Sequence, residues 1–112
     1  MAVVMATFAS CNKDQKINKQ LDGEWNMSMY DGKAITAGDV VLKFVAGKDG
    51  AGTVTTTIKG QTPAAGTYVI KDAKFTSTTG SKSETSTINE HTSTKFKITN
   101  DTDHKVIEMT KK

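Results

Sequence analysis

The segment Thr94-Lys95-Phe96-Lys97-Ile98-Thr99 is followed by Asn100-Asp101-Thr102-Asp103 and then by His104-Lys105-Val106-Ile107-Glu108-Met109-Thr110. Apolar and polar side chains alternate in the first and third segments, so the apolar ones lie on one face of an extended chain. The Asn/Asp-rich segment between them is typical of a turn. This stretch therefore predicts two antiparallel β-strands that share one buried face.

The same alternation recurs in six earlier segments, separated by turn residues at intervals of roughly eight to twelve residues, as in a β-sandwich or barrel. These segments are 24–30, 40–46, 52–59, 67–71, 74–79 and 84–90, and the last carries only Ile88 as an inward apolar residue. Short turns between consecutive strands make an antiparallel meander, and closure into a barrel removes exposed edges. We predict an all-β fold, a small up-and-down barrel of about eight strands.

Length and composition limit the protein to one domain with one core. The chain has 112 residues, and its fifteen basic residues are spread among twelve acidic ones to give a net charge of +3. All fifteen are Lys, without the basic stripe and stacking aromatic residues of nucleic-acid binders. We therefore expect no nucleic-acid partner. The single cysteine, Cys11, excludes an internal disulfide.

The first residues are typical of an exported protein. Residues 1–10 form an uncharged apolar run that is too short to span a bilayer, which takes about 20 residues, but fits the apolar part of a signal peptide. Phe8-Ala9-Ser10-Cys11 resembles the bacterial lipobox. The resemblance implies diacylglycerol on Cys11, cleavage after Ser10 and a mature chain that begins at Cys11. Since no Lys or Arg precedes the run, we expect the natural start to lie upstream of Met1.

An alternative is that residues 1–10 form a first strand and that Cys11 is a buried thiol. The lack of alternation in this run favours the signal peptide. We therefore divide the chain into a signal peptide remnant (1–10), the lipidated Cys11 with a flexible polar tether (11–20), and the barrel (21–112). The lipid anchor implies the outer membrane of a bacterial cell envelope, with the periplasmic and surface faces both open.

Leu21-Asp22-Gly23-Glu24-Trp25 resembles the Gly-x-Trp signature of the lipocalins and of their bacterial lipocalin-like relatives. Gly50-Ala51-Gly52-Thr53 and Gly66-Thr67-Tyr68-Val69-Ile70 are similar to later strands of those proteins. With the lipobox, the chain resembles a lipocalin-like lipoprotein of the Bacteroidetes type, which implies that Trp25 closes one end of the barrel. Thr56 and the sparse segment 84–90 are where we expect unfilled interior space.

The candidate residues for lining a ligand site, or for forming the core, are the large apolar side chains of the predicted inner face: Trp25, Met27, Met29, Phe44, Tyr68 and Phe96. The thioethers of Met27 and Met29 could adapt to a ligand, although such residues more often form plain core. The carboxylates Glu24, Glu84, Glu90 and Glu108 are predicted on outward faces, where they pair with Lys.

No catalytic constellation is recognisable in the sequence, so we expect a protein that is not an enzyme and that holds no cofactor. His91 and His104 are thirteen positions apart and are flanked by turn residues, so we expect no metal site. Two functions stay open. The first is a lipid-anchored module that binds a small apolar ligand; the second is a structural or protein-interaction module of the envelope, whose barrel is filled and whose outer face or loop 79–84 docks a protein partner.

Overall fold

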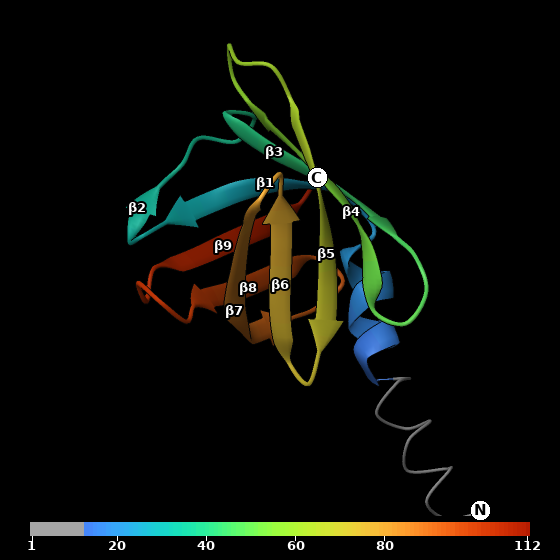
Figure 1. Cartoon of the computed structure of the whole chain (residues 1–112). Coiled ribbons are helices and arrows are strands. Elements are labelled where there is room, and N and C mark those ends of the chain that lie inside the picture. Colours follow the sequence, from blue (N-terminus) through green and yellow to red (C-terminus); the bar gives the residue numbers. More distant parts are fainter. Residues whose placement is uncertain (1–12) are drawn as a thin grey trace, which may run out of the picture.

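The computed structural model describes residues 13–112, in which it contains one short helix and nine β-strands. The predicted signal peptide and the lipidation site Cys11 lie outside the described residues. Residues 13–21 form the helix. The strands follow it in chain order (Figure 1): β1 (Gly23–Tyr30), β2 (Lys33–Ala34), β3 (Val40–Ala46), β4 (Ala51–Ile58), β5 (Ala64–Lys71), β6 (Lys74–Thr79), β7 (Lys82–His91), β8 (Lys95–Asn100) and β9 (Val106–Lys111).

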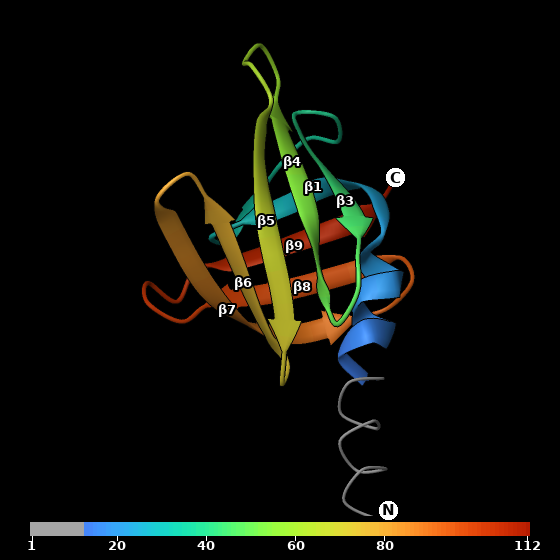
Figure 2. The ribbon, with the colours of Figure 1, turned by 45° about the vertical axis from the view of Figure 1, so that its right-hand side comes forward.

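The eight long strands form a closed antiparallel barrel. Each long strand pairs with the next one in sequence, from β1 with β3 through β8 with β9, and β9 returns to pair with β1. Closure pairs both edges of each of these strands. The two-residue strand β2 pairs only with the end of β1. The predicted eight-stranded meander is confirmed, and Figure 2 shows the barrel from the side, with the helix at one end.

The hairpin turns follow the local sequence. Asp72 and Ala73 connect β5 to β6 with positive φ angles of 51° and 62°, the conformation of a type I′ turn, whose twist matches that of the flanking strands. The Ser/Thr-rich segment 76–87 folds as the β6–β7 hairpin within the barrel. β5 begins at Ala64, three residues earlier than predicted. The residue before it, Pro63, has no N–H to donate to a neighbouring strand, so the strand begins directly after it.

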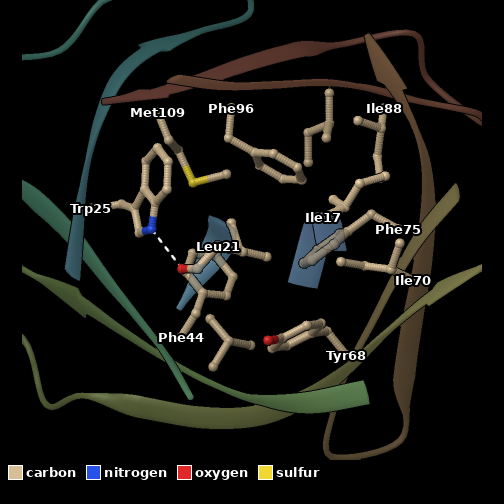
Figure 3. Close-up of a cluster of buried hydrophobic side chains, with 12 residues drawn as sticks. Ile17, Leu21, Trp25, Phe44, Tyr68, Ile70, Phe75, Ile88, Phe96 and Met109 are labelled. Carbon is tan, nitrogen blue, oxygen red and sulfur yellow. Dashed lines mark hydrogen bonds between the residues drawn. The ribbon is translucent and has the colours of Figure 1, made fainter. Parts of the chain in front are cut away.

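The prediction of a flexible tether over 11–20 is wrong in its described part. Residues 13–21 are helical, and the side chains of Ile17 and Leu21 are only 4% and 1% exposed. These two residues lie four positions apart and therefore on one face of the helix, which covers one end of the barrel (Figure 3). A helix this short is marginal in water by itself, so packing against the barrel stabilises it.

Aromatic rings fill the barrel beneath the helix. Trp25, Phe44, Tyr68, Phe75 and Phe96 are all buried, and five ring pairs among them have centroids 5.4 to 6.4 Å apart. Figure 3 shows these rings pointing inward from different strands. Most of the pairs meet edge to face, the arrangement that favours aromatic contacts in cores. This cluster closes the end of the barrel where β1 begins, which we call the helix end.

Trp25 also fixes the end of the helix. Its indole Nε1 donates a hydrogen bond to the backbone oxygen of Leu21 at 2.7 Å (dashed in Figure 3). The last carbonyls of a helix have no partner within it, so this bond satisfies one of them inside the barrel. The expectation that Trp25 closes one end of the barrel is consistent with this position.

A β-bulge in β1 overturns one predicted face. Met27 pairs with Met109, but Met29 pairs with the adjacent residue Glu108, so β1 carries one extra residue at this point. Directly paired residues lie on the same face of a sheet. Met29 therefore shares the outer face with Glu108, and the prediction that it joins Met27 on the inner face is wrong.

Candidate functional site

A polar network fastens the helix to the β3–β4 turn and closes the helix end. Asn18 is 0% exposed. Its side-chain nitrogen donates to the Ala51 carbonyl at 3.0 Å, and its side-chain oxygen accepts a hydrogen bond from the Tyr68 hydroxyl at 2.5 Å. Gln15 accepts a bond from the Gly50 N–H at 2.8 Å and donates to the Gly47 carbonyl at 3.0 Å. This end of the barrel is therefore sealed by satisfied hydrogen bonds.

The Tyr68 hydroxyl stays protonated within this network. Burial, and to a lesser extent the negative charge of Asp22, raises the pKa of Tyr68 to about 12. A protonated hydroxyl can donate to Asn18, whereas a phenolate could not. The network is therefore intact throughout the neutral range.

The opposite end of the barrel holds a cavity of about 130 Å³. We call it the open end, because the β6–β7 and β8–β9 turns lie there and the cavity reaches the exposed residues Thr79 and Glu84 at its mouth. Its apolar lining consists of Met27, Leu42, Phe44, Val54, Phe75, Ile98, Ile107 and Met109. Its polar lining consists of Thr56, Ser77, Thr79, Glu84, Ser86 and Asn100.

The polar and apolar residues of the cavity lie on different walls. Most of the polar ones belong to β6, β7 and β8, whereas β9, β1 and β3 contribute apolar side chains only. The β6–β7 register explains the polar wall, because Ser77 lies opposite Glu84 and Phe75 lies opposite Ser86, all on the inner face. The cavity is therefore amphipathic across its width.

The buried hydroxyl of Ser86 faces this space. Ser86 is only 5% exposed and lines the cavity; since no enclosed side-chain polar atom of residues 13–112 lacks a partner, its hydroxyl is open to the cavity rather than sealed away from it. A buried hydroxyl of this kind is normally paired with a protein group or with water. It is thus a group that a bound molecule could satisfy.

Glu84 corrects a second prediction, because it is one of the four carboxylates expected on outward faces. Glu24 and Glu108 do lie outside and approach Lys112 and Lys95 at 3.3 and 3.7 Å. Glu84 lies at the cavity mouth instead.

The alternation of β7 explains this position. Ile88 is buried, and counting back in steps of two passes through Ser86 to Glu84. Glu90 does not follow this pattern. The register shifts between Ile88 and Glu90, so that Glu90 lies opposite Lys97.

The six candidate residues separate into three groups. Met27 and Phe44 line the cavity, and Trp25, Tyr68 and Phe96 form the core below it. Met29 lies on the outer face and takes part in neither. The prediction of unfilled space at Thr56 and along 84–90 is confirmed, since Thr56, Glu84 and Ser86 all line the cavity.

Sequence reasoning missed the polar wall itself. Ser77, Ser86 and Asn100 each lie two residues from a buried apolar residue of the same strand, namely Phe75, Ile88 and Ile98. That even spacing was the signal that they face inward. It was overlooked because small polar residues are more common on solvent-facing sides of strands.

A second hollow, of about 460 Å³, lies beside the helix at the other end. Charges of both signs border it, from Lys13, Asp14 and Asp72, together with His91. Of the apolar residues at its edge, Ile17 and Ile88 are buried in the core and Ala73 is exposed. Its lining is therefore more polar than that of the open-end cavity.

No three His, Cys, Asp or Glu side chains gather into a metal site within residues 13–112. His91 ends β7 near the helix, whereas His104 lies in the β8–β9 turn at the open end. The described helix is neither long nor apolar enough to cross a membrane.

No family model and no curated protein matches the chain. Among solved structures, the chain is similar to a lipocalin-like protein from Bacteroides uniformis, with a TM-score of 0.64 and 15% sequence identity. The match covers 83% of this chain and 99% of that protein. Identity this low shows the fold alone, and the predicted lipocalin-like barrel is thereby confirmed.

Proposed function

We propose that this chain is a lipid-anchored, non-enzymatic protein of the bacterial cell envelope, whose barrel binds one small, largely apolar molecule in the open-end cavity. The cavity itself is the observation that carries the proposal, since it combines an apolar lining with an exposed mouth. Ligand sites are typically concave and mostly apolar, with a few convergent polar groups. The likeness to a lipocalin-like barrel supports a binding role.

The cavity volume limits the size of the ligand. At about 130 Å³ it is smaller than drug-sized pockets, which span about 300 to 1,000 Å³. A dry apolar cavity of about 150 Å³ in another protein accepts benzene or xenon. We therefore expect the part of the ligand inside the barrel to be about the size of one ring, and any further atoms of the ligand to lie at the mouth.

The arrangement of the two ends supports the anchor. The helix begins no later than Lys13, two positions after Cys11. A lipid on Cys11 would place the helix end nearest the membrane, because two residues span only about 7 Å. The open end would then face away from the membrane, where a ligand could reach it.

Binding is tested by titrating the protein with benzyl alcohol and following backbone amide signals by NMR. We expect shifts at residues of the open end, such as Ile98 and Ser86, and none in the helix. Thr56→Phe puts a ring into the cavity and should weaken binding at least tenfold. Thr57→Phe places the same ring on the outer face of the same strand, so its affinity should stay within twofold of wild type.

The absence of any saturable shift in wild-type protein would overturn the binding proposal. So would equal loss of affinity in both Phe variants, because the effect would then not depend on the cavity.

The anchor is tested separately, by the intact mass of the protein purified from bacterial membranes. We expect a chain that begins at Cys11 and is heavier by its acyl groups. An unmodified chain that still carries Met1 would show that the lipobox resemblance does not reflect processing.

A further inference from the structure

We infer that the cavity selects a compact amphiphile, with an apolar body of about one ring and a protonated amine as its polar head. This inference rests on the proposed function and adds the chemistry of the ligand. It follows from three features of the cavity: an apolar wall, a facing wall that carries the hydroxyls of Ser77 and Ser86, and a carboxylate at the mouth.

The apolar wall determines where the body of the ligand lies. Met27, Leu42, Ile107 and Met109 present only hydrocarbon and thioether surface to the cavity. A head group placed there would lose its hydration without a partner, which is unfavourable for any polar atom. The ring of the ligand therefore packs against this wall, and its head points toward β6 and β7.

Hydroxyl groups lie on the facing wall. Ser86 is nine-tenths buried and lines the cavity together with Ser77 of the neighbouring strand. A hydroxyl can accept a hydrogen bond from an N–H or O–H donor. A ligand with a donor on its first substituent would satisfy Ser86 and gain affinity.

Glu84 determines which charge on the head group of the ligand is favoured at this wall. It lies directly opposite Ser77 and two positions before Ser86 on the same face, at the mouth of the cavity. Lys82 lies two positions before Glu84 on the same strand, and no ion pair joins the two among residues 13–112. The free carboxylate attracts a protonated amine and repels an anionic head such as a carboxylate.

The test compares three ligands that share one ring and differ in the head: benzylamine, benzyl alcohol and benzoate. Each is titrated at neutral pH and low salt, and its dissociation constant is taken from amide shifts. We expect benzylamine to bind tightest and benzoate weakest. In Glu84→Gln the ratio of the amine affinity to the alcohol affinity should fall about two- to fivefold, the range that exposed ion pairs give.

Glu90→Gln is the matched control, because it makes the same change of charge on the outer side of the same strand. It should leave the order and the ratios of the three ligands as they are in the wild type. Ser86→Ala should weaken both benzylamine and benzyl alcohol severalfold, since each loses a hydrogen-bond partner.

The outcomes separate this inference from the function on which it rests. If all three ligands bind equally well, if benzoate binds best, or if Glu84→Gln leaves the ratio unchanged, the choice of an amine head is wrong although the cavity binds. If none of the three binds, the proposed function itself fails.

Discussion

Asn18 joins three parts of the molecule through one buried side chain. It belongs to the helix, donates to the carbonyl of Ala51 at the start of β4, and accepts from Tyr68 of β5. Asn18→Ala would leave the Tyr68 hydroxyl and the Ala51 carbonyl buried without these partners. We expect a loss of about 2 to 3 kcal/mol in the free energy of unfolding, measured by denaturant titration.

Lys19→Ala is the control for this change, because Lys19 is the next residue of the same helix and is exposed. It should change the stability by less than about 0.5 kcal/mol. A loss for Asn18→Ala no larger than that of the control would contradict the role given to the network.

Tyr68 gives the network a signature at high pH. Its pKa is raised from 10.0 to about 12 in the folded protein, so between these values the unfolded chain releases a proton that the folded protein keeps. The stabilisation is complete below pH 10 and is lost as the pH rises toward 12.

The advantage of wild type over Tyr68→Phe should therefore shrink by about 2 kcal/mol between pH 9 and pH 12. Comparing the two proteins at each pH cancels the titration of the lysines. Tyr30→Phe, which removes a half-exposed hydroxyl, is the matched control. A constant difference between wild type and Tyr68→Phe would contradict the pKa assigned to Tyr68.

At the residue scale, alternation predicted the core well and failed where the register shifts. Trp25, Phe44, Tyr68 and Phe96 face inward as expected. Met29 does not, because one extra residue in β1 reverses the faces after it. A β-bulge depends on the partner strand, so β1 alone carried no sign of it.

The prediction that Glu84 lies on an outward face failed for a different reason. The step of four from Ile88 already placed Glu84 on the inner face, but a carboxylate there contradicts the usual exclusion of charge from interiors. Its position becomes reasonable once the barrel is open at that end, which the sequence alone did not show.

At the scale of elements, the helix is the main departure from expectation. Its two large apolar residues, Ile17 and Leu21, are too few to give a helical pattern, and the residue between them on the buried face is the polar Asn18. The helix forms because the end of the barrel provides an apolar surface for it to pack against, together with hydrogen-bond partners. Such tertiary stabilisation outweighs weak local preference.

Lys19→Pro distinguishes an integral helix from a flexible tether. Lys19 is exposed, so the change acts on the backbone, where proline removes a helical hydrogen bond and clashes with the preceding turn. We expect a loss of about 3 kcal/mol in unfolding free energy relative to Lys19→Ala. A tether would tolerate proline, so equal stability of the two variants would contradict the integral helix.

The strands and most turns could be predicted because their signals are local. Two predicted strands, 40–46 and 74–79, have the observed bounds of β3 and β6. Only Asp72 and Ala73 separate the predicted strands 67–71 and 74–79, and two residues suffice for a tight hairpin turn. The two-residue strand β2 was missed, since nothing in its own sequence differs from a loop.

At the scale of the whole molecule, the two ends of the barrel differ in composition and role. Aromatic rings and the helix fill one end, whereas the other holds a cavity of about 130 Å³ with both apolar and polar residues in its lining. This division leaves the open end free to exchange side-chain packing for ligand contacts.

The proposed binding role requires the open-end cavity, of about 130 Å³, to admit a small apolar guest. A crystal structure of the protein under xenon pressure tests it most directly, because xenon enters apolar cavities of this size. We expect a xenon atom among Phe44, Val54, Ile98 and Met109, and none there in Thr56→Phe. A wild-type barrel in which side chains fill this space and exclude xenon would contradict it.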